Sequence, residues 1–215
     1  MTISNSKMIV AASGAIIGWF AVIAQFILMI QHRVFDIPET IIRFFSFFAI
    51  LVNIIVAVYF TLIYLRPVAD KSKSWFNASS QTAITVYILV VGIIYNLMLR
   101  SLWASTGMQK IVENLLHFII PGLYFFYWLV FVEKQGLKWK QAFVWLLYPL
   151  LYFIAILIRG AFSNTNYYPY PFVDVYNHGY EKVFIGCGFI LLLVLILSFT
   201  LIGVSKFVTV KNNRT

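Results

Sequence analysis

Six long hydrophobic runs constrain the fold of this 215-residue sequence more than any other feature. A helix needs roughly 20 apolar residues to cross a hydrocarbon core of about 30 Å, and each run approaches or exceeds that length. The chain is 62% hydrophobic and 11% charged, which is more apolar surface than a water-soluble domain of this size can bury. We therefore predict one all-α transmembrane domain over residues 1–215, with spans at about 8–30, 41–65, 82–103, 112–132, 142–161 and 183–208. The first run is longer than the roughly 7–15-residue core of a signal peptide, so we expect it to be a retained helix.

The basic residues indicate how this six-helix bundle is oriented. Ten of the sixteen fall on one side of alternating spans: Lys7, Arg66, Lys71, Lys73, Lys134, Lys138, Lys140, Lys206, Lys211 and Arg214. The positive-inside rule places that side, with both termini, in the cytoplasm. Orientation in a bilayer thus accounts for the net charge of +9, and we expect no nucleic acid partner. The single cysteine, Cys187, allows no disulfide within the chain, and we expect no metal or other cofactor.

Polar side chains inside the runs gather toward the ends that we place near the outer leaflet. Charged groups and imidazoles are costly in lipid, so they usually face the bundle interior and mark functional sites. At about 100° per residue, several of them share a helix face in pairs: Ser46 with Asn53, Asn96 with Arg100, Glu113 with His117, and Tyr152 with Arg159. A site assembled from these faces would lie just beneath the lipid headgroups.

The residue types in this set fit acyl transfer. A serine hydroxyl becomes a nucleophile when a base takes its proton, and histidine is the usual base because its pKa lies near neutrality. We assign Ser46 and His117 as a catalytic pair, with substrate or oxyanion contacts from Asn53, Asn96, Arg100, Tyr152 and Arg159. Glu113 or Asp174 could orient the imidazole, and the tyrosine-rich segment 163–182 is expected to form an ordered cap.

Two other functions remain open on the residues alone. An intramembrane serine often bonds a carbonyl four residues back, and an arginine near a helix end can extend to lipid phosphates, as in a non-catalytic lipid-binding or transport bundle. The second alternative is a metal-dependent membrane hydrolase. Its ligands would come from a set that we place on the outer side: His32, His117, His178, Asp36, Glu113 and Asp174.

A family resemblance enters at these same residues. The segments that carry it are Arg43–Phe48, Tyr95-Asn96 with Arg100, Asn114–His117, Tyr148-Pro149 through Tyr152 to Arg159-Gly160, and Tyr168–Phe172. Over nearly its whole length the chain resembles a bacterial family of integral membrane proteins named Pr-six-Pr. More distantly it is similar to the androgen-induced and androgen-dependent membrane hydrolases of animals, which cleave fatty acid esters of hydroxy fatty acids with an intramembrane threonine and histidine.

The resemblance implies a function, a location and two site residues. It implies hydrolysis of a membrane lipid ester, a place in the bacterial cytoplasmic membrane, the family's histidine at His117 and its hydroxyl at Ser46. The chain departs from the animal pattern by having serine in place of threonine. It departs from the common bacterial pattern at Ala49, where threonine is expected, and at Val52, where serine is expected.

Overall fold

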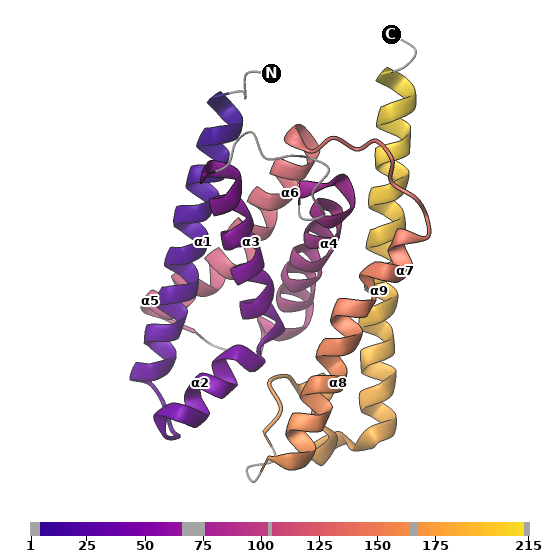
Figure 1. Ribbon diagram of the computed structural model, residues 1–215. Coiled ribbons are helices and arrows are strands. Elements are labelled where there is room, and N and C mark those ends of the chain that lie inside the picture. Colours follow the sequence, from indigo (N-terminus) through magenta and orange to yellow (C-terminus); the bar gives the residue numbers. More distant parts are fainter. Residues whose placement is uncertain (1–4, 66–75, 103–104, 164–166, 213–215) are drawn as a thin grey trace. The chain divides into compact units, whose positions relative to one another are not determined.

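The computed structural model describes residues 5–65, 76–102, 105–163 and 167–212, and all their regular elements are helical (Figure 1). Six of the helices are long and apolar enough to cross a membrane: Asn5–Gln31, Phe48–Leu65, Ala78–Leu99, Gly107–Phe131, Gln141–Phe162 and Val175–Val208. The predicted all-α architecture of a multi-pass membrane protein is thereby confirmed. Several positions named above lie outside the described residues: Arg66, Lys71, Lys73, position 103, residues 164–166 and Arg214.

Two compact units make up the chain, residues 1–133 and residues 134–215. The first contains α1 (Asn5–Gln31), α2 (Ile37–Ser46), α3 (Phe48–Leu65), α4 (Ala78–Ile94), α5 (Gly107–Asn114), α6 (Ile120–Phe131) and the π-helical segments η2 (Tyr95–Leu99) and η3 (Leu115–Ile119). The second contains α7 (Gln141–Trp145), α8 (Leu147–Phe162), the 3₁₀ turn η4 (Pro171–Val173) and α9 (Val175–Asn212).

Small residues bring α1 against α3 in the first unit. Gly14 and Gly18, one helical turn apart, face Phe60 and Ala57, and a Cβ built on either glycine would lie within 3 Å of those side chains. Such close approach of two backbones is the usual packing of membrane helices, where dispersion contacts replace the hydrophobic effect. The core between α3 and α6 is aromatic: Tyr59 and Phe60 of α3 and Tyr124, Tyr127 and Trp128 of α6 are all buried.

The predicted second span, 41–65, is interrupted at Phe47. This residue has extended backbone angles (φ −80°, ψ 120°) that end α2, and its carbonyl accepts the N–H groups of Ile50 and Leu51 at the start of α3. The short helix α2, which begins after the Asp36 cap, therefore points away from the axis of α3 (Figure 1). Ser46 ends α2 while Asn53 lies on α3, so the helical phase that paired them does not apply.

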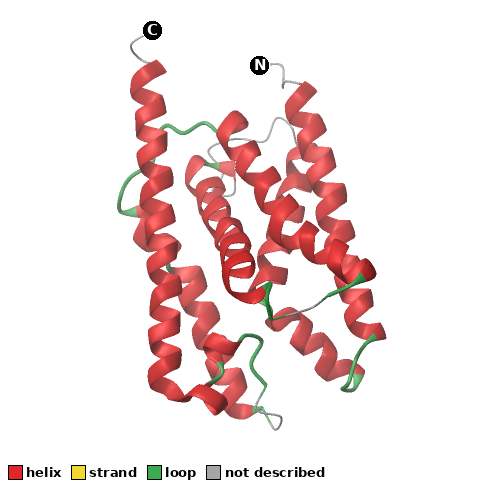
Figure 2. Cartoon of the chain, turned by 180° about the vertical axis from the view of Figure 1, so that it is seen from behind, coloured by secondary structure: helices red, strands yellow, loops and turns green. Residues whose placement is uncertain are grey.

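The second unit has two interruptions of its own. The fifth span is broken at Leu146, between α7 and α8, and α9 contains a non-helical residue at Gly179 (φ 75°, ψ 161°). A positive φ of this kind is readily adopted only by glycine. Figure 2 shows α8 running beside α9, and the connection between them holds η4. The ring of Tyr168 in this connection packs on Gly160 of α8, where a Cβ would lie 2.0 Å from the ring.

Candidate functional site

Two π-helical segments of the first unit carry most of the predicted site residues. In η2 the Arg100 N–H donates to Tyr95 O, and in η3 the Ile120 N–H donates to Leu115 O, both across five residues rather than four. Asn96 lies in η2 and His117 in η3. Turns of this kind are rare inside α-helices and often occur at functional sites, because they rotate the side chains that follow them.

The imidazole of His117 is held on two sides. Its Nδ1 lies 2.9 Å from the main-chain carbonyl of Glu113, and its ring stacks on Tyr95 with centroids 3.8 Å apart and planes inclined by 13°. A carbonyl oxygen can only accept, so Nδ1 carries the proton and the neutral ring has its basic lone pair on Nε2. His117 is therefore a fixed imidazole with a defined tautomer.

The part of Glu113 that contacts the imidazole is its main-chain carbonyl and not its carboxylate. The carboxylate instead accepts hydrogen bonds from the hydroxyls of Tyr95 (2.8 Å) and Ser105, and from the amide of Gln109 (3.0 Å). Gln109 also donates to Gln25 on α1 at 3.1 Å. Glu113 thus has two positioning contacts. Its main-chain carbonyl bonds His117, and its carboxylate bonds Tyr95, on whose ring His117 stacks.

The two predicted amides contact the same helix turn as His117. Asn53 is fully buried and its Nδ2 donates to Leu116 O at 3.2 Å, while Asn96 Nδ2 donates to His117 O at 3.1 Å. Arg100 extends from η2 with an exposed side chain, and its Nη1 donates to Asn96 Oδ1 at 3.2 Å. The structure thus brings Asn53, Asn96, Arg100, Glu113 and His117 into one connected network.

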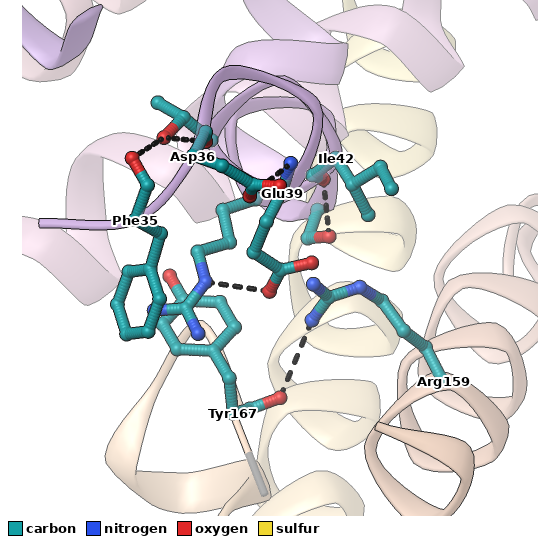
Figure 3. A network of polar contacts seen from close by, with 9 residues as sticks. Phe35, Asp36, Glu39, Ile42, Arg159 and Tyr167 are labelled. Carbon is teal, nitrogen blue, oxygen red and sulfur yellow. Dashed lines mark hydrogen bonds and ion pairs between the residues drawn. The ribbon is translucent and has the colours of Figure 1, made fainter. Parts of the chain in front are cut away.

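Ser46 lies on α2 with two charged neighbours on the same helix. Its buried hydroxyl donates to Ile42 O at 2.7 Å. Each of the two predicted catalytic side chains thus bonds a main-chain carbonyl four residues earlier, Ser46 at Ile42 and His117 at Glu113. Arg43 donates to Glu39 at 2.7 Å and its guanidinium stacks on Phe35, 3.5 Å from the ring centroid (Figure 3).

The remaining predicted residues belong to the second unit. Tyr152 is buried on α8, and Arg159 Nη1 donates to Tyr167 O at 3.3 Å, also drawn in Figure 3. Asp174 caps the start of α9 by accepting from the main-chain N–H of Asn177 at 3.0 Å. Burial raises the pKa of the Tyr168 hydroxyl, and the neighbouring Tyr180 and Asp174 add to that rise. The described part of the expected cap is thus held to α8 and α9.

Over the described ranges, no three His, Cys, Asp or Glu side chains lie close enough together to hold a metal ion. The metal-dependent alternative therefore has no cluster in this part of the chain to support it.

Sequence reasoning missed four members of the network: Tyr95, Ser105, Gln109 and Gln25. Gln109 could have been found, because it continues the Glu113–His117 stripe at four-residue spacing. Tyr95 comes from a different helix, and its stacking on His117 depends on how η2 and η3 pack.

No known protein family, curated protein or solved structure matches the chain.

Proposed function

We propose that this multi-pass membrane protein hydrolyses fatty-acyl ester bonds of membrane lipids, with His117 as general base. The observation that carries the proposal is the fixed tautomer of His117, with Nδ1 bound to the Glu113 carbonyl and the basic lone pair on Nε2. The Tyr95 ring limits rotation of the imidazole. The distant resemblance of the chain to the animal membrane lipid hydrolases, which use an intramembrane histidine and hydroxyl residue, supports the same chemistry.

Ser46 is the proposed nucleophile. Nε2 of His117 takes the hydroxyl proton as Oγ bonds to the acyl carbon, and the same proton then passes to the departing alcohol oxygen. A water molecule hydrolyses the acyl-serine in a second round, again with His117 as the base. Before the first step the Ser46 O–H must break its hydrogen bond to Ile42 O and turn toward the base.

Arg100 is the proposed donor for the developing oxyanion or for a headgroup oxygen. A guanidinium has five N–H groups, and within the described residues Arg100 uses one of them, on Asn96. Its side chain is exposed at the end of η2. A preorganised cationic donor at this position stabilises negative charge on the reacting ester oxygen.

A fluorophosphonate probe tests the proposal in membranes, since it bonds covalently to an activated serine with loss of fluoride. The wild type is expected to label, and Ser46→Ala and His117→Gln are expected to reduce the labelling rate by about 100-fold or more. The chain supplies matched controls. Ser198 donates to Val194 O at 2.7 Å as Ser46 does to Ile42 O, and His32 Nδ1 bonds Leu28 O at 2.9 Å. Ser198→Ala and His32→Gln should label like the wild type.

A non-catalytic lipid-binding bundle is the second candidate, favoured by the hydrogen bond from Ser46 Oγ to its own helix at Ile42 O. In that case the wild type would take up no probe, and an intact lipid would copurify with it. Retention of that lipid should then fall in Arg100→Gln. Labelling that persists unchanged in Ser46→Ala would remove Ser46 from the nucleophile role.

A further inference from the structure

Two side-chain amides from different helices end on consecutive carbonyls of η3. Asn53, on α3, donates to Leu116 O at 3.2 Å, and Asn96, in η2, donates to His117 O at 3.1 Å. Main-chain carbonyls inside a helix are normally satisfied by main-chain N–H groups further along the same helix. Two consecutive carbonyls that accept from side chains of other helices therefore indicate that a main-chain hydrogen bond is missing from this helix.

Pro121 explains the missing main-chain hydrogen bond. In an α-helix the N–H of residue 121 would donate to His117 O, and in a π-helix it would donate to Leu116 O. Proline has no N–H, so either register leaves one of these two carbonyls without its backbone donor. The two carbonyls that residue 121 would serve are the two that Asn53 and Asn96 contact.

The amides have no hydrogens left for a ligand. The second bond of Asn53 Nδ2 goes to Ala49 O at 2.8 Å, and that of Asn96 Nδ2 goes to Gly92 O at 2.8 Å. Each NH₂ group has two N–H donors, so both groups are fully used on main-chain carbonyls. This arrangement is suited to holding the backbone and does not suit donation to an oxyanion, the role that the sequence indicated.

We propose that Asn53 and Asn96 are positioning residues that replace the hydrogen bond withheld by Pro121 and so fix the π turn that carries His117. Gly92 completes the arrangement, because a Cβ there would lie 3.1 Å from His117 O and 3.3 Å from Pro121 Cβ. The absence of a side chain at Gly92 lets η2 come close enough for Asn96 to reach. The consequence for catalysis rests on the proposed function, while the structural coupling to Pro121 does not.

Pro121→Ala supplies the test, because alanine restores the missing N–H. Asn96→Leu and Asn53→Leu keep the side-chain size and remove the donors. In the wild-type background each should speed hydrogen exchange of the amides in 115–122 by about tenfold, since an unpaired buried carbonyl is left behind. In the Pro121→Ala background the same substitutions should change exchange by about twofold or less. Equal effects in both backgrounds overturn the proposal.

Thr61→Val is the matched control. Thr61 also forms a hydrogen bond between helices inside the first unit, accepting from Trp19 Nε1 at 3.0 Å, but it lies away from η3. Its effect on exchange should be the same in the wild-type and Pro121→Ala backgrounds. If neither asparagine variant accumulates as folded protein, recovery on adding Pro121→Ala supports the proposal, and continued failure overturns it.

The His117 ring gives a readout that a purely stabilising role would not move. The chain has three histidines, so ring ¹⁵N resonances can be assigned by substituting them one at a time. Asn96→Leu should shift the His117 nitrogens away from the single Nδ1–H tautomer, and Pro121→Ala should restore them. Restored exchange and resonances without any fluorophosphonate labelling would reject the hydrolase and keep this inference. Fluorophosphonate labelling of the wild type, together with asparagine substitutions that affect exchange equally in the wild-type and Pro121→Ala backgrounds, would keep the hydrolase and reject this inference.

Discussion

The ring of Tyr95 lies flat against the imidazole of His117, with centroids 3.8 Å apart, and its hydroxyl donates to Glu113 at 2.8 Å. The main-chain carbonyl of Glu113 in turn accepts a hydrogen bond from the His117 Nδ1–H group. Three residues from two helices thus form a closed loop of contacts around one histidine. Substitution of any one of the three residues should therefore disturb the positions of the other two.

Tyr95→Phe keeps the stacking and removes the hydroxyl. We expect a loss of about 1–3 kcal/mol in the free energy of unfolding, because the half-buried Glu113 carboxylate loses a donor. Tyr95→Leu should lose roughly 0.5–1.5 kcal/mol more, since the ring contact also disappears. Equilibrium unfolding in detergent measures both. Tyr64→Phe, on an exposed side chain, should change stability by about 0.5 kcal/mol or less, and a similar loss there would contradict the specific role of Tyr95.

Glu113→Gln separates the two functions of that residue. The amide keeps the shape but replaces one acceptor oxygen with a donor, which then faces the donors of Tyr95, Ser105 or Gln109. We expect stability to fall by about 1.5–3 kcal/mol. The His117 tautomer should persist, because its partner is the main-chain carbonyl. Ring ¹⁵N spectra check this, with the exposed Glu181→Gln as the stability control. A changed tautomer would show that the carboxylate orients the ring.

Run length and hydropathy were sufficient to predict the six apolar helices, because a bilayer demands long apolar segments with internal backbone hydrogen bonds. The break at Phe47 could not be predicted, since Phe44–Phe48 contains neither glycine nor proline and reads as continuous helix. Within single helices the spacing was informative, as for Glu113 with His117. Spacing could not indicate that Asn53 and Asn96 would use their hydrogens on η3, because that depends on the approach of three helices.

Gly92→Ala should destabilise the protein by about 1–3 kcal/mol, because the new Cβ meets the His117 carbonyl at 3.1 Å and moves the helices apart. Gly122 is the matched control on α6. A Cβ there meets nothing within 4 Å, so Gly122→Ala should be neutral or stabilise by up to about 1 kcal/mol through helix propensity. Thermal unfolding of the two variants in the same detergent compares them. Equal behaviour would mean that η2 and η3 can separate without strain.

The orientation predicted from the basic residues has a direct test. Reporter fusions after Thr215 and after Tyr170 should lie on opposite sides of the membrane, with the first in the cytoplasm, because the Val175–Val208 span separates them. Paired fusions to an enzyme active only in the cytoplasm and to one active only outside it give complementary signals. Signals from the same side at both positions would be incompatible with a single crossing by α9.

Gly160→Ala tests how the connection between α8 and α9 is held. The added Cβ would lie 2.0 Å from the Tyr168 ring, so the ring must shift away from Gly160. We expect a loss of about 1–3 kcal/mol and faster proteolysis around Tyr168. Tyr168→Ala removes the obstacle, and adding Gly160→Ala to it should therefore have an effect of about 0.5 kcal/mol or less. That non-additivity is the result to look for, because two independent sites would simply add. Gly188→Ala, where a Cβ meets nothing within 4 Å, should leave proteolysis unchanged in either background.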